Sequence, residues 1–562
     1  MKVIIVGGVA GGATAAARIR RLDEQAEIIV FERSGYISYA NCGLPYYIGD
    51  VITDGGALTL QTPESFDRRF RVDMRVRHEV TAIHPDRKCV TVRNLTTGEV
   101  FEESYDKLLL SPGAKPVRPP LPGIDSEKLF TLRTVEDTFR IKDYLTRTQA
   151  RSAVLIGGGF IGLELAENLR RLGLEVTIVQ RPRQLMSPFD ADMAAFLHGE
   201  VRRHGVKLAL GYNVTGFADR DGGIEVQLEN APSLQADLAV LAVGVAPDAA
   251  LAREAGLALG IKGSILVDDR MQTSHPDIYA VGDAVQVKHF VTGDDALIAL
   301  AGPANKQGRI AADNICGGDS RYTGSQGSSV LQVFDLTAAC TGLSETAAHR
   351  AGLQTDKVIL SPMNHAGYYP GGKVMTLKVV FERQTFRLLG AQIIGYDGVD
   401  KRIDVLATAL RAGLKATDLM DLDLAYAPPY SSAKDPVNMA GFMIDNIAHG
   451  LKQWYLEDAA RLPRDGSVTL LDTRTPGEFS RGHIEGFTNI PVDDLRARIG
   501  ELDPAKPVYV ICQSGLRSYI ATRILMGHGF DAYNFTGGFR FYDAVMHDRA
   551  LTEQSLPCGM DR

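Results

Sequence analysis

Cysteine, tryptophan and long apolar runs are scarce in this sequence. Its 562 residues contain six cysteines and one tryptophan. The cysteines, at positions 42, 89, 316, 340, 512 and 558, form no C-x-x-C pair and no metal-ligand spacing, which disfavours a disulfide framework or a metal centre and fits a reducing cytoplasm. No apolar run is long enough to span a membrane, and we expect no signal peptide before the first strand.

An excess of positive charge is also missing. The net charge of −7 argues against a nucleic-acid-binding protein. A length of 562 residues suggests about four domains at the usual ~150 residues each. The apolar and charged fractions are those of an ordinary globular protein, so function must be sought in local motifs.

Two strand–glycine–helix units dominate the first half. Val3–Val6 precedes the turn Gly7–Gly12, and Ala153–Ile156 precedes the turn Gly157–Gly162. Small residues at a helix N-terminus let backbone N–H groups approach a pyrophosphate. The repeat therefore predicts two dinucleotide-binding modules.

The first unit also carries an acid at the expected place. Glu32 ends the next strand, where an acid hydrogen-bonds a ribose 2′-hydroxyl. Val9 departs from the pattern because it stands where a second glycine is usual. Thr14, Arg18 and Arg21 share one face of the following helix. A solvated basic face explains that stripe by itself, and an anionic ligand is the alternative.

Cys42 lies in the segment Ser38–Tyr47, shortly after this unit, with no second cysteine four or five residues away. The internal redox disulfide of glutathione-reductase-like enzymes is thereby excluded. A lone thiol of this kind forms a mixed disulfide, a sulfenate or a persulfide, with the thiolate as its reactive form.

With these motifs, residues 1–445 resemble the single-cysteine branch of the pyridine nucleotide-disulfide reductase superfamily, and especially the coenzyme A-disulfide reductase group. Members share the S-x-x-N-C motif of Ser38, Asn41 and Cys42. The resemblance implies FAD and NAD(P)H as cofactors and coenzyme A as substrate or bound carrier. It also implies that a flavin and a helix terminus near Cys42 lower the pKa of its thiol.

The resemblance further implies a role for each matched residue. The implied FAD contacts are Gly7, Gly8, Ala10, Gly11, Glu32, Arg33, Val80, Ser111, Pro112, Gly113, Asp283, Ala301 and Pro303. The implied nicotinamide-nucleotide contacts are Gly157, Gly159, Phe160, Ile161, Gly162, Glu164, Gln180 and Gly244. The implied coenzyme A contacts are Thr14, Arg18, Arg21, Ser38, Asn41, Arg71, Asn305 and Lys434. Tyr368 and Tyr426 match tyrosines that come near the reactive cysteine from a dimerisation domain, so the resemblance implies a homodimer whose active site the partner subunit completes.

Two points stay open at this stage. Gln180, rather than an acid, ends the strand after the second turn, and Arg181 and Arg183 follow it, so NADH and NADPH are both possible. The related NADH oxidases and peroxidases cycle their single cysteine through a sulfenate. They carry a histidine just inside the first turn, where this chain has Val9-Ala10-Gly11, and that difference favours a thiol-linked substrate.

A second thiol motif lies near the C-terminus. Cys512 follows the strand Val508–Ile511 and heads the loop that ends at Arg517 and Ser518, where N–H groups stabilise a thiolate or persulfide. Arg517 adds a positive charge at the far end of this loop, so we expect it to act with Cys512 in catalysis. Residues 460–550 resemble rhodanese through Asp472-Thr473-Arg474, Glu478, Gly482-His483-Ile484 and Gly537-Gly538. The resemblance implies that Cys512 is the sulfur carrier.

The expected fold class is α/β, with two Rossmann-like dinucleotide-binding domains, an α+β dimerisation domain and a C-terminal rhodanese-like domain. The expected bounds are 1–112 with 248–323 for FAD, 113–247 for NAD(P)H, 324–445 for dimerisation, 446–462 for a helical or irregular linker and 463–562 for rhodanese. The predicted function is NAD(P)H-dependent reduction of coenzyme A persulfide, polysulfide or coenzyme A disulfide at Cys42, with sulfur delivered by Cys512. An oxidase or peroxidase and a persulfide-delivery or redox-sensing protein are the alternatives.

Overall fold

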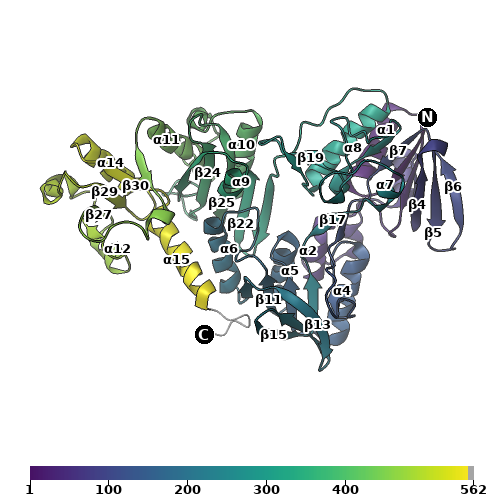
Figure 1. Ribbon diagram of the computed structural model, residues 1–562, viewed down its shortest axis with the longest axis horizontal. Helices are drawn as coiled ribbons and strands as arrows, with labels where there is room; N and C mark the ends of the chain where they lie inside the picture. Colours follow the sequence, from purple (N-terminus) through teal and green to yellow (C-terminus); the bar gives the residue numbers. More distant parts are fainter. Residues whose placement is uncertain (555–562) are drawn as a thin grey trace. The chain divides into compact units, whose positions relative to one another are not determined.

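The computed structural model describes residues 1–554, and Cys558 lies outside them. The chain divides into two compact units (Figure 1). The first comprises residues 1–183 and 205–327, and the second comprises residues 184–204 together with 328 to the end of the described chain. None of the helices in residues 1–554 combines the length and apolar character that a membrane span requires.

Two parallel five-stranded sheets form the framework of the first unit. One has the order β18 (Ile278–Ala280), β7 (Lys107–Leu110), β1 (Lys2–Val6), β2 (Glu27–Glu32), β3 (Asp73–Val76). The other has the order β12 (Lys207–Leu210), β11 (Glu175–Gln180), β10 (Ser152–Ile156), β16 (Leu238–Leu241), β9 (Leu129–Phe130). Their central strands are buried on both faces, as parallel sheets covered by helices require.

Helices and small antiparallel sheets complete this unit. The main helices are α1 (Ala10–Leu22), α2 (Leu44–Ile48), α3 (Pro63–Phe70), α4 (Val135–Thr148), α5 (Phe160–Arg171), α7 (Ala250–Glu254) and α8 (Ala301–Ile315). The antiparallel sheets are β4 (His78–His84) with β5 (Cys89–Asn94) and β6 (Val100–Ser104), and β13 (Val214–Arg220) with β14 (Gly223–Leu228) and β15 (Ala231–Ala236); β8 (Ala114–Pro116) pairs with β17 (Val245–Pro247). Helices α1 and α8 pack side by side (Figure 1).

The second unit contains an antiparallel sheet with helices and a smaller parallel sheet. The antiparallel sheet has the order β21 (Ser329–Val333), β22 (Leu336–Gly342), β25 (Leu388–Gly395), β24 (Thr376–Glu382), β23 (Thr355–Leu360). Its helices are α6 (Ala191–Arg203), α9 (Glu345–Arg350), α10 (Val399–Arg411) and α11 (Pro436–Ala448). Residues 184–204, expected as part of the NAD(P)H domain, thus cluster with this sheet.

Buried charge fixes α6 to that sheet. Lys378 on β24 is 1% exposed and lies within 2.8–3.1 Å of carboxylate oxygens of Asp190, Asp192 and Glu345. These carboxylates raise the pKa of Lys378 far above its usual value despite its burial. The ammonium group therefore stays charged and joins α6, α9 and β24.

The parallel sheet of this unit has the order β26 (Lys452–Trp454), β30 (Ala532–Phe535), β29 (Val508–Ile511), β27 (Thr469–Asp472), β28 (Thr488–Asn489). Its helices are α12 (Pro476–Ser480), α13 (Leu495–Arg498), α14 (Leu516–Gly527) and α15 (Gly538–Gln554). The segment 446–462, expected as a linker, here contributes the edge strand β26. Trp454 is 1% exposed and donates its indole N–H to the Val510 carbonyl at 3.0 Å, which explains why this segment is ordered into the sheet.

Candidate functional site

The first glycine turn leaves no room for side chains at its critical positions. A Cβ on Gly7 would lie 2.1 Å from the Ser111 carbonyl oxygen, and one on Gly12 would lie 1.9 Å from the Gly7 oxygen. Glu32, only 8% exposed, accepts a hydrogen bond from the Gly8 N–H at 2.8 Å. The turn therefore presents backbone N–H groups beside a fixed carboxylate, which fits a dinucleotide with its ribose at the strand end.

Two other expected FAD contacts form ion pairs, and three more have defined places in the fold. Arg33 forms an ion pair with Asp248 at 2.9 Å. Asp283 forms one with Arg133 at 2.7 Å. Val80 is buried within β4, and Ala301 and Pro303 lie in the first turn of α8.

The helix pair α1 and α8 brings together part of the expected coenzyme A set. The Thr14 hydroxyl donates to the Asn305 amide oxygen at 2.6 Å. The Arg18 Nε lies 2.6 Å from an Asp313 carboxylate oxygen on α8. Arg21 is exposed on the same helix. The basic face is therefore anchored to α8 at Arg18, while Arg21 reaches solvent.

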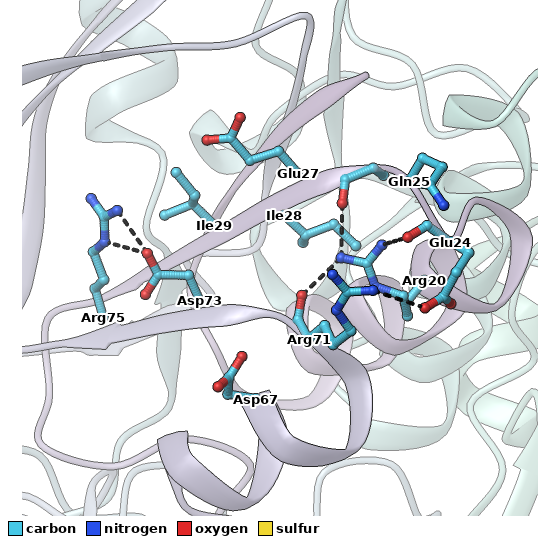
Figure 2. Close-up of a pocket in the computed structure, with 11 residues that line it drawn as sticks. Arg20, Glu24, Gln25, Glu27, Ile28, Ile29, Asp67, Arg71, Asp73 and Arg75 are labelled. Atoms are coloured by element: carbon cyan, nitrogen blue, oxygen red, sulfur yellow. Dashed lines mark hydrogen bonds and ion pairs between the residues drawn. The ribbon is translucent and has the colours of Figure 1, made fainter.

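Arg71 lies in a different setting, a pocket of about 280 Å³ beside the C-terminal end of α1 (Figure 2). The pocket is lined by Arg20, Glu24, Gln25, Ala26, Glu27, Ile28, Ile29, Asp67, Arg71, Asp73 and Arg75. The Arg20 guanidinium donates hydrogen bonds to five backbone carbonyls. A guanidinium nitrogen of Arg71 lies 3.5 Å from a carboxylate oxygen of Glu24. Thr14, Arg18 and Arg21 are not among the lining residues, so the pocket does not unite Arg71 with the basic face.

Cys42 lies in the short helix Asn41–Gly43 and is exposed. Its segment is tied to the first turn because the Ser38 N–H donates to the Gly8 carbonyl at 2.9 Å. Partial burial and the nearby charge of Glu164 raise the pKa of the Cys42 thiol, while Arg133 lowers it. The protein groups therefore act opposite to the expected lowering of this pKa, because burial and then the charges of Glu164 and Asp283 outweigh the effect of Arg133.

Glu164 itself is shifted. Burial, with a smaller contribution from Glu167, raises the pKa of Glu164 from 4.5 to about 7. The same residue contributes to raising the pKa of Tyr46 to about 12. A carboxyl group that titrates near neutrality thus faces Cys42 and Tyr46 within the first unit.

The second glycine turn repeats the first. Gly157 has φ +114°, and a Cβ on Gly162 would lie 2.0 Å from the Gly157 oxygen. Gly159 and Gly244 face open space. The Gly158 N–H donates to the Gln180 amide oxygen at 3.0 Å. Phe160 and Ile161 begin α5, so this turn also offers a helix N-terminus to a phosphate.

The tyrosines expected near the active site form a pair within the second unit. The hydroxyls of Tyr368 and Tyr426 are 2.8 Å apart. The two side chains are 76% and 46% exposed. Lys434, in the next segment, is also exposed. Such exposed phenols are available to a group that approaches from outside the chain.

Cys512 directly follows β29 and is fully buried. Its sulfur accepts a hydrogen bond from the Gly515 N–H at 3.1 Å, and its thiol donates to the Ser518 hydroxyl at 3.3 Å. Gly515 has φ +102° at the head of α14, and Gly538 lies so close that a Cβ would meet Gln513 and Ser514 backbone atoms at 2.7 Å. These close approaches constrain the loop, which directs the Gly515 N–H toward the sulfur.

Two arginines hold this loop. Arg517 binds both carboxylate oxygens of Glu478 at 2.7 Å, and this pairing lowers the pKa of Glu478 to about 2. Arg474 binds Asp472 and donates to the Gly482 carbonyl at 2.7 Å. Arg517, expected to add positive charge beside Cys512, is thus largely neutralised by Glu478.

Three protein-family patterns match this chain. The pyridine nucleotide-disulphide oxidoreductase pattern matches residues 1–308, and the dimerisation domain of the same family matches residues 329–436. The chain belongs to this family. A rhodanese-like domain matches residues 455–544, so the expected fold class is confirmed.

Relatives share both the reductase part and the whole arrangement. A coenzyme A disulfide reductase of Staphylococcus epidermidis is 38% identical over 442 residues, which are 78% of this chain and 99% of that protein. The reduced Bacillus anthracis CoADR-RHD has a TM-score of 0.95 and 48% identity, covering 98% of each chain. A NAD-dependent persulfide reductase from A. fulgidus has a TM-score of 0.90 and 36% identity, covering 96% of this chain and all of the other.

The sequence reasoning missed Gly12 and Arg133. Gly12 occupies the place that Gly162 has in the second turn, as the matching close approaches to Gly7 and Gly157 show. Aligning the two turns residue by residue would have found it. Arg133 pairs with Asp283 across 150 residues of sequence, and no local spacing signals such a contact.

Proposed function

We propose that this protein is an NAD(P)H-dependent flavoprotein reductase that cleaves sulfur–sulfur bonds of coenzyme A persulfide, polysulfide or coenzyme A disulfide. The observation that carries the proposal is the accessible thiol of Cys42. Its segment is joined to a dinucleotide turn by the hydrogen bond from the Ser38 N–H to the Gly8 carbonyl. All five described cysteines are free, and Cys42 has no sequence neighbour to form an internal disulfide. Two of the relatives named above are a coenzyme A disulfide reductase and a NAD-dependent persulfide reductase, whose names refer to substrates with sulfur–sulfur bonds.

The glycine turns fit the two nucleotides that the family uses. The turn at Gly7 admits no Cβ and adjoins Glu32, and the turn at Gly157 faces open space at Gly159 and Gly244. When bound, FAD and NAD(P)H supply the two electrons that the reaction consumes. For a persulfide the balance is one coenzyme A persulfide, one NAD(P)H and one proton giving coenzyme A thiol, hydrogen sulfide and NAD(P)⁺.

Cys42 performs the sulfur step. Its thiolate attacks one sulfur of the substrate, so a new bond to Cys42 Sγ forms as the substrate S–S bond breaks and its other half leaves as a thiolate or hydrosulfide. Arg133 favours the thiolate, and Glu164, once ionised, disfavours it. The exposed phenols of Tyr368 and Tyr426 are proposed to act on a partner subunit's site by donating a proton to a leaving thiolate.

Cys512 is proposed to deliver the sulfur. Its thiolate takes a sulfane sulfur from a donor and becomes a persulfide, which the Gly515 N–H and the neighbouring N–H groups of the loop stabilise. The thiol of coenzyme A then attacks that outer sulfur, which restores Cys512 and yields coenzyme A persulfide. The Thr14, Arg18 and Arg21 face, with Ser38, Asn41 and Asn305, is the proposed coenzyme A site of one subunit. Lys434, like Tyr368 and Tyr426, is proposed to act at the partner subunit's site. Arg71, which lies 3.5 Å from Glu24, is proposed as a further coenzyme A contact.

Assembly and location complete the proposal. The dimerisation-domain match supports a homodimer, and we propose that the partner subunit completes the active site. The free thiols are compatible with a reducing cytoplasm, which we propose as the compartment.

The direct test replaces Cys42 with serine. We expect NAD(P)H oxidation driven by coenzyme A persulfide or coenzyme A disulfide to fall by at least about 10³-fold, because the nucleophile is lost. Cys316→Ser is the matched control, since Cys316 is a partly buried thiol at the end of α8, and it should keep full activity. Turnover that survives in C42S would disprove the role of Cys42. Rapid consumption of NADH with oxygen or peroxide alone would instead assign an oxidase or peroxidase.

A further inference from the structure

The two nucleotide sites share one frame but differ in charge at one position. Glu32 ends β2 and accepts from the Gly8 N–H at 2.8 Å, while Gln180 ends β11 and accepts from the Gly158 N–H at 3.0 Å. Both side chains thus lie where an adenosine ribose meets the strand end. A carboxylate there accepts a hydrogen bond from the ribose 2′-hydroxyl of NADH and repels the 2′-phosphate of NADPH. An amide carries no charge that would repel it.

The residues that follow strengthen the contrast. Arg33, directly after Glu32, is ion-paired with Asp248. Arg181 and Arg183, directly after Gln180, are exposed and form no ion pair within residues 1–554. Two uncompensated guanidinium groups at one strand end attract a dianion, and guanidinium binds phosphate in a two-pronged geometry.

Backbone contacts hold this arginine segment in place. The Gly211 N–H donates to the Gln180 carbonyl at 2.8 Å and to the Pro182 carbonyl at 3.2 Å. Gly211 also leaves room for the stem of Arg183, whose Cγ would lie 3.0 Å from a Cβ at that position. The arginines are therefore presented from a fixed loop, which reduces the entropy lost when they bind a ligand.

We infer that the second turn prefers NADPH to NADH, with Arg181 and Arg183 binding the 2′-phosphate and Gln180 tolerating it. The inference rests on the proposed function only in assigning this turn to the nicotinamide nucleotide. It concerns binding, so it stands whether the sulfur substrate is a persulfide, a polysulfide or a disulfide.

The test is calorimetric binding of NADP⁺ and NAD⁺ to the oxidised, FAD-loaded protein at low ionic strength. We expect NADP⁺ to bind at least about tenfold more tightly than NAD⁺, and salt to narrow that ratio. Arg181→Ala with Arg183→Ala should weaken NADP⁺ binding by about tenfold or more and leave NAD⁺ within about twofold. Gln180→Glu, which copies Glu32, should reverse the preference.

A matched control removes a charge from the opposite end of the strands in the same sheet. Arg151 is exposed, directly precedes β10 and lies away from the strand end that carries Gln180. Arg151→Ala should leave both affinities unchanged, which separates local binding from a change in net charge. The inference is overturned if the wild-type protein binds NAD⁺ equally or more tightly, or if the double variant weakens both nucleotides alike. This experiment contains no sulfur substrate and measures nucleotide binding alone. Its outcome is therefore separate from the outcome of the activity test of the proposed reductase reaction.

Discussion

At the scale of single residues, the electrostatics around Cys42 are the feature that sequence could not supply. Arg133 and Glu164 act on the thiol in opposite directions, and neither lies near Cys42 in the sequence. Because burial raises the pKa of Glu164 to about 7, its carboxylate forms as pH rises through neutrality. Its negative charge then opposes ionisation of Cys42 in the range where the enzyme needs a thiolate.

Glu164→Gln should therefore lower the pKa of Cys42 and make the thiol more reactive at pH 7.5. We expect about two- to tenfold faster alkylation by iodoacetamide, because a larger fraction of the thiol is ionised. The measurement is the alkylation rate against pH in the reduced protein, followed at Cys42 by mass spectrometry. Glu175→Gln, at the first residue of β11, is the control, and its alkylation rate should match that of the wild type. A slower or unchanged rate in E164Q would show that Glu164 does not control the thiol.

Prediction from sequence worked best where chemistry and spacing coincide. Both glycine turns, Glu32, Cys42 and the Cys512 loop could be identified because each motif is local. The pairs Arg18–Asp313 and Arg133–Asp283 could not, because they join residues 295 and 150 positions apart. Gly12 was overlooked although the second turn of the same chain contains its counterpart.

At the scale of elements, the helices that follow the phosphate- and sulfur-binding loops begin within the loops themselves. They begin at Ala10, Phe160 and Leu516. The reason is that turn residues also form the first helical turn, whose free N–H groups are the ones offered to a ligand. The segment around Trp454 differs from expectation. It was expected to be a helical or irregular linker, and it contributes the edge strand β26.

The attachment of α6 to the antiparallel sheet gives an element-scale prediction. Lys378→Met leaves Asp190, Asp192 and Glu345 buried without their cation, so the free energy of unfolding at pH 7 should fall by about 3–5 kcal/mol. Lys378 lowers the pKa values of Asp190 and Glu345, so its stabilisation is present above the unfolded carboxyl pKa values and is lost as pH falls through the folded ones. Guanidinium unfolding of both proteins at pH 7 and at a series of pH values below 4 measures this difference, which should shrink only in the acid range.

A surface lysine provides the comparison for that experiment. Lys452 forms an ion pair with Asp531 at 2.7 Å, but both side chains are about half exposed. Lys452→Met should change stability little because exposed pairs contribute little. Equal effects of K378M and K452M would contradict a structural role for the buried network.

At the scale of the whole molecule, two thiols with different surroundings belong to one chain. Cys42 is exposed and lies beside a dinucleotide turn, whereas Cys512 is buried and accepts a hydrogen bond from the Gly515 N–H. The first arrangement suits reduction of a sulfur–sulfur bond, and the second suits storage of a persulfide. We therefore expect the two thiols to act in sequence on sulfane sulfur.

The most direct test of that account is the stoichiometry of sulfide release without oxygen. We predict one hydrogen sulfide per NAD(P)H oxidised when coenzyme A persulfide is supplied, with this ratio unchanged in Cys512→Ser. When polysulfide and catalytic coenzyme A are supplied instead, C512S should slow turnover at least about tenfold, because it cannot carry sulfur to coenzyme A. Oxidation of NAD(P)H without sulfide release from coenzyme A persulfide would contradict the central claim.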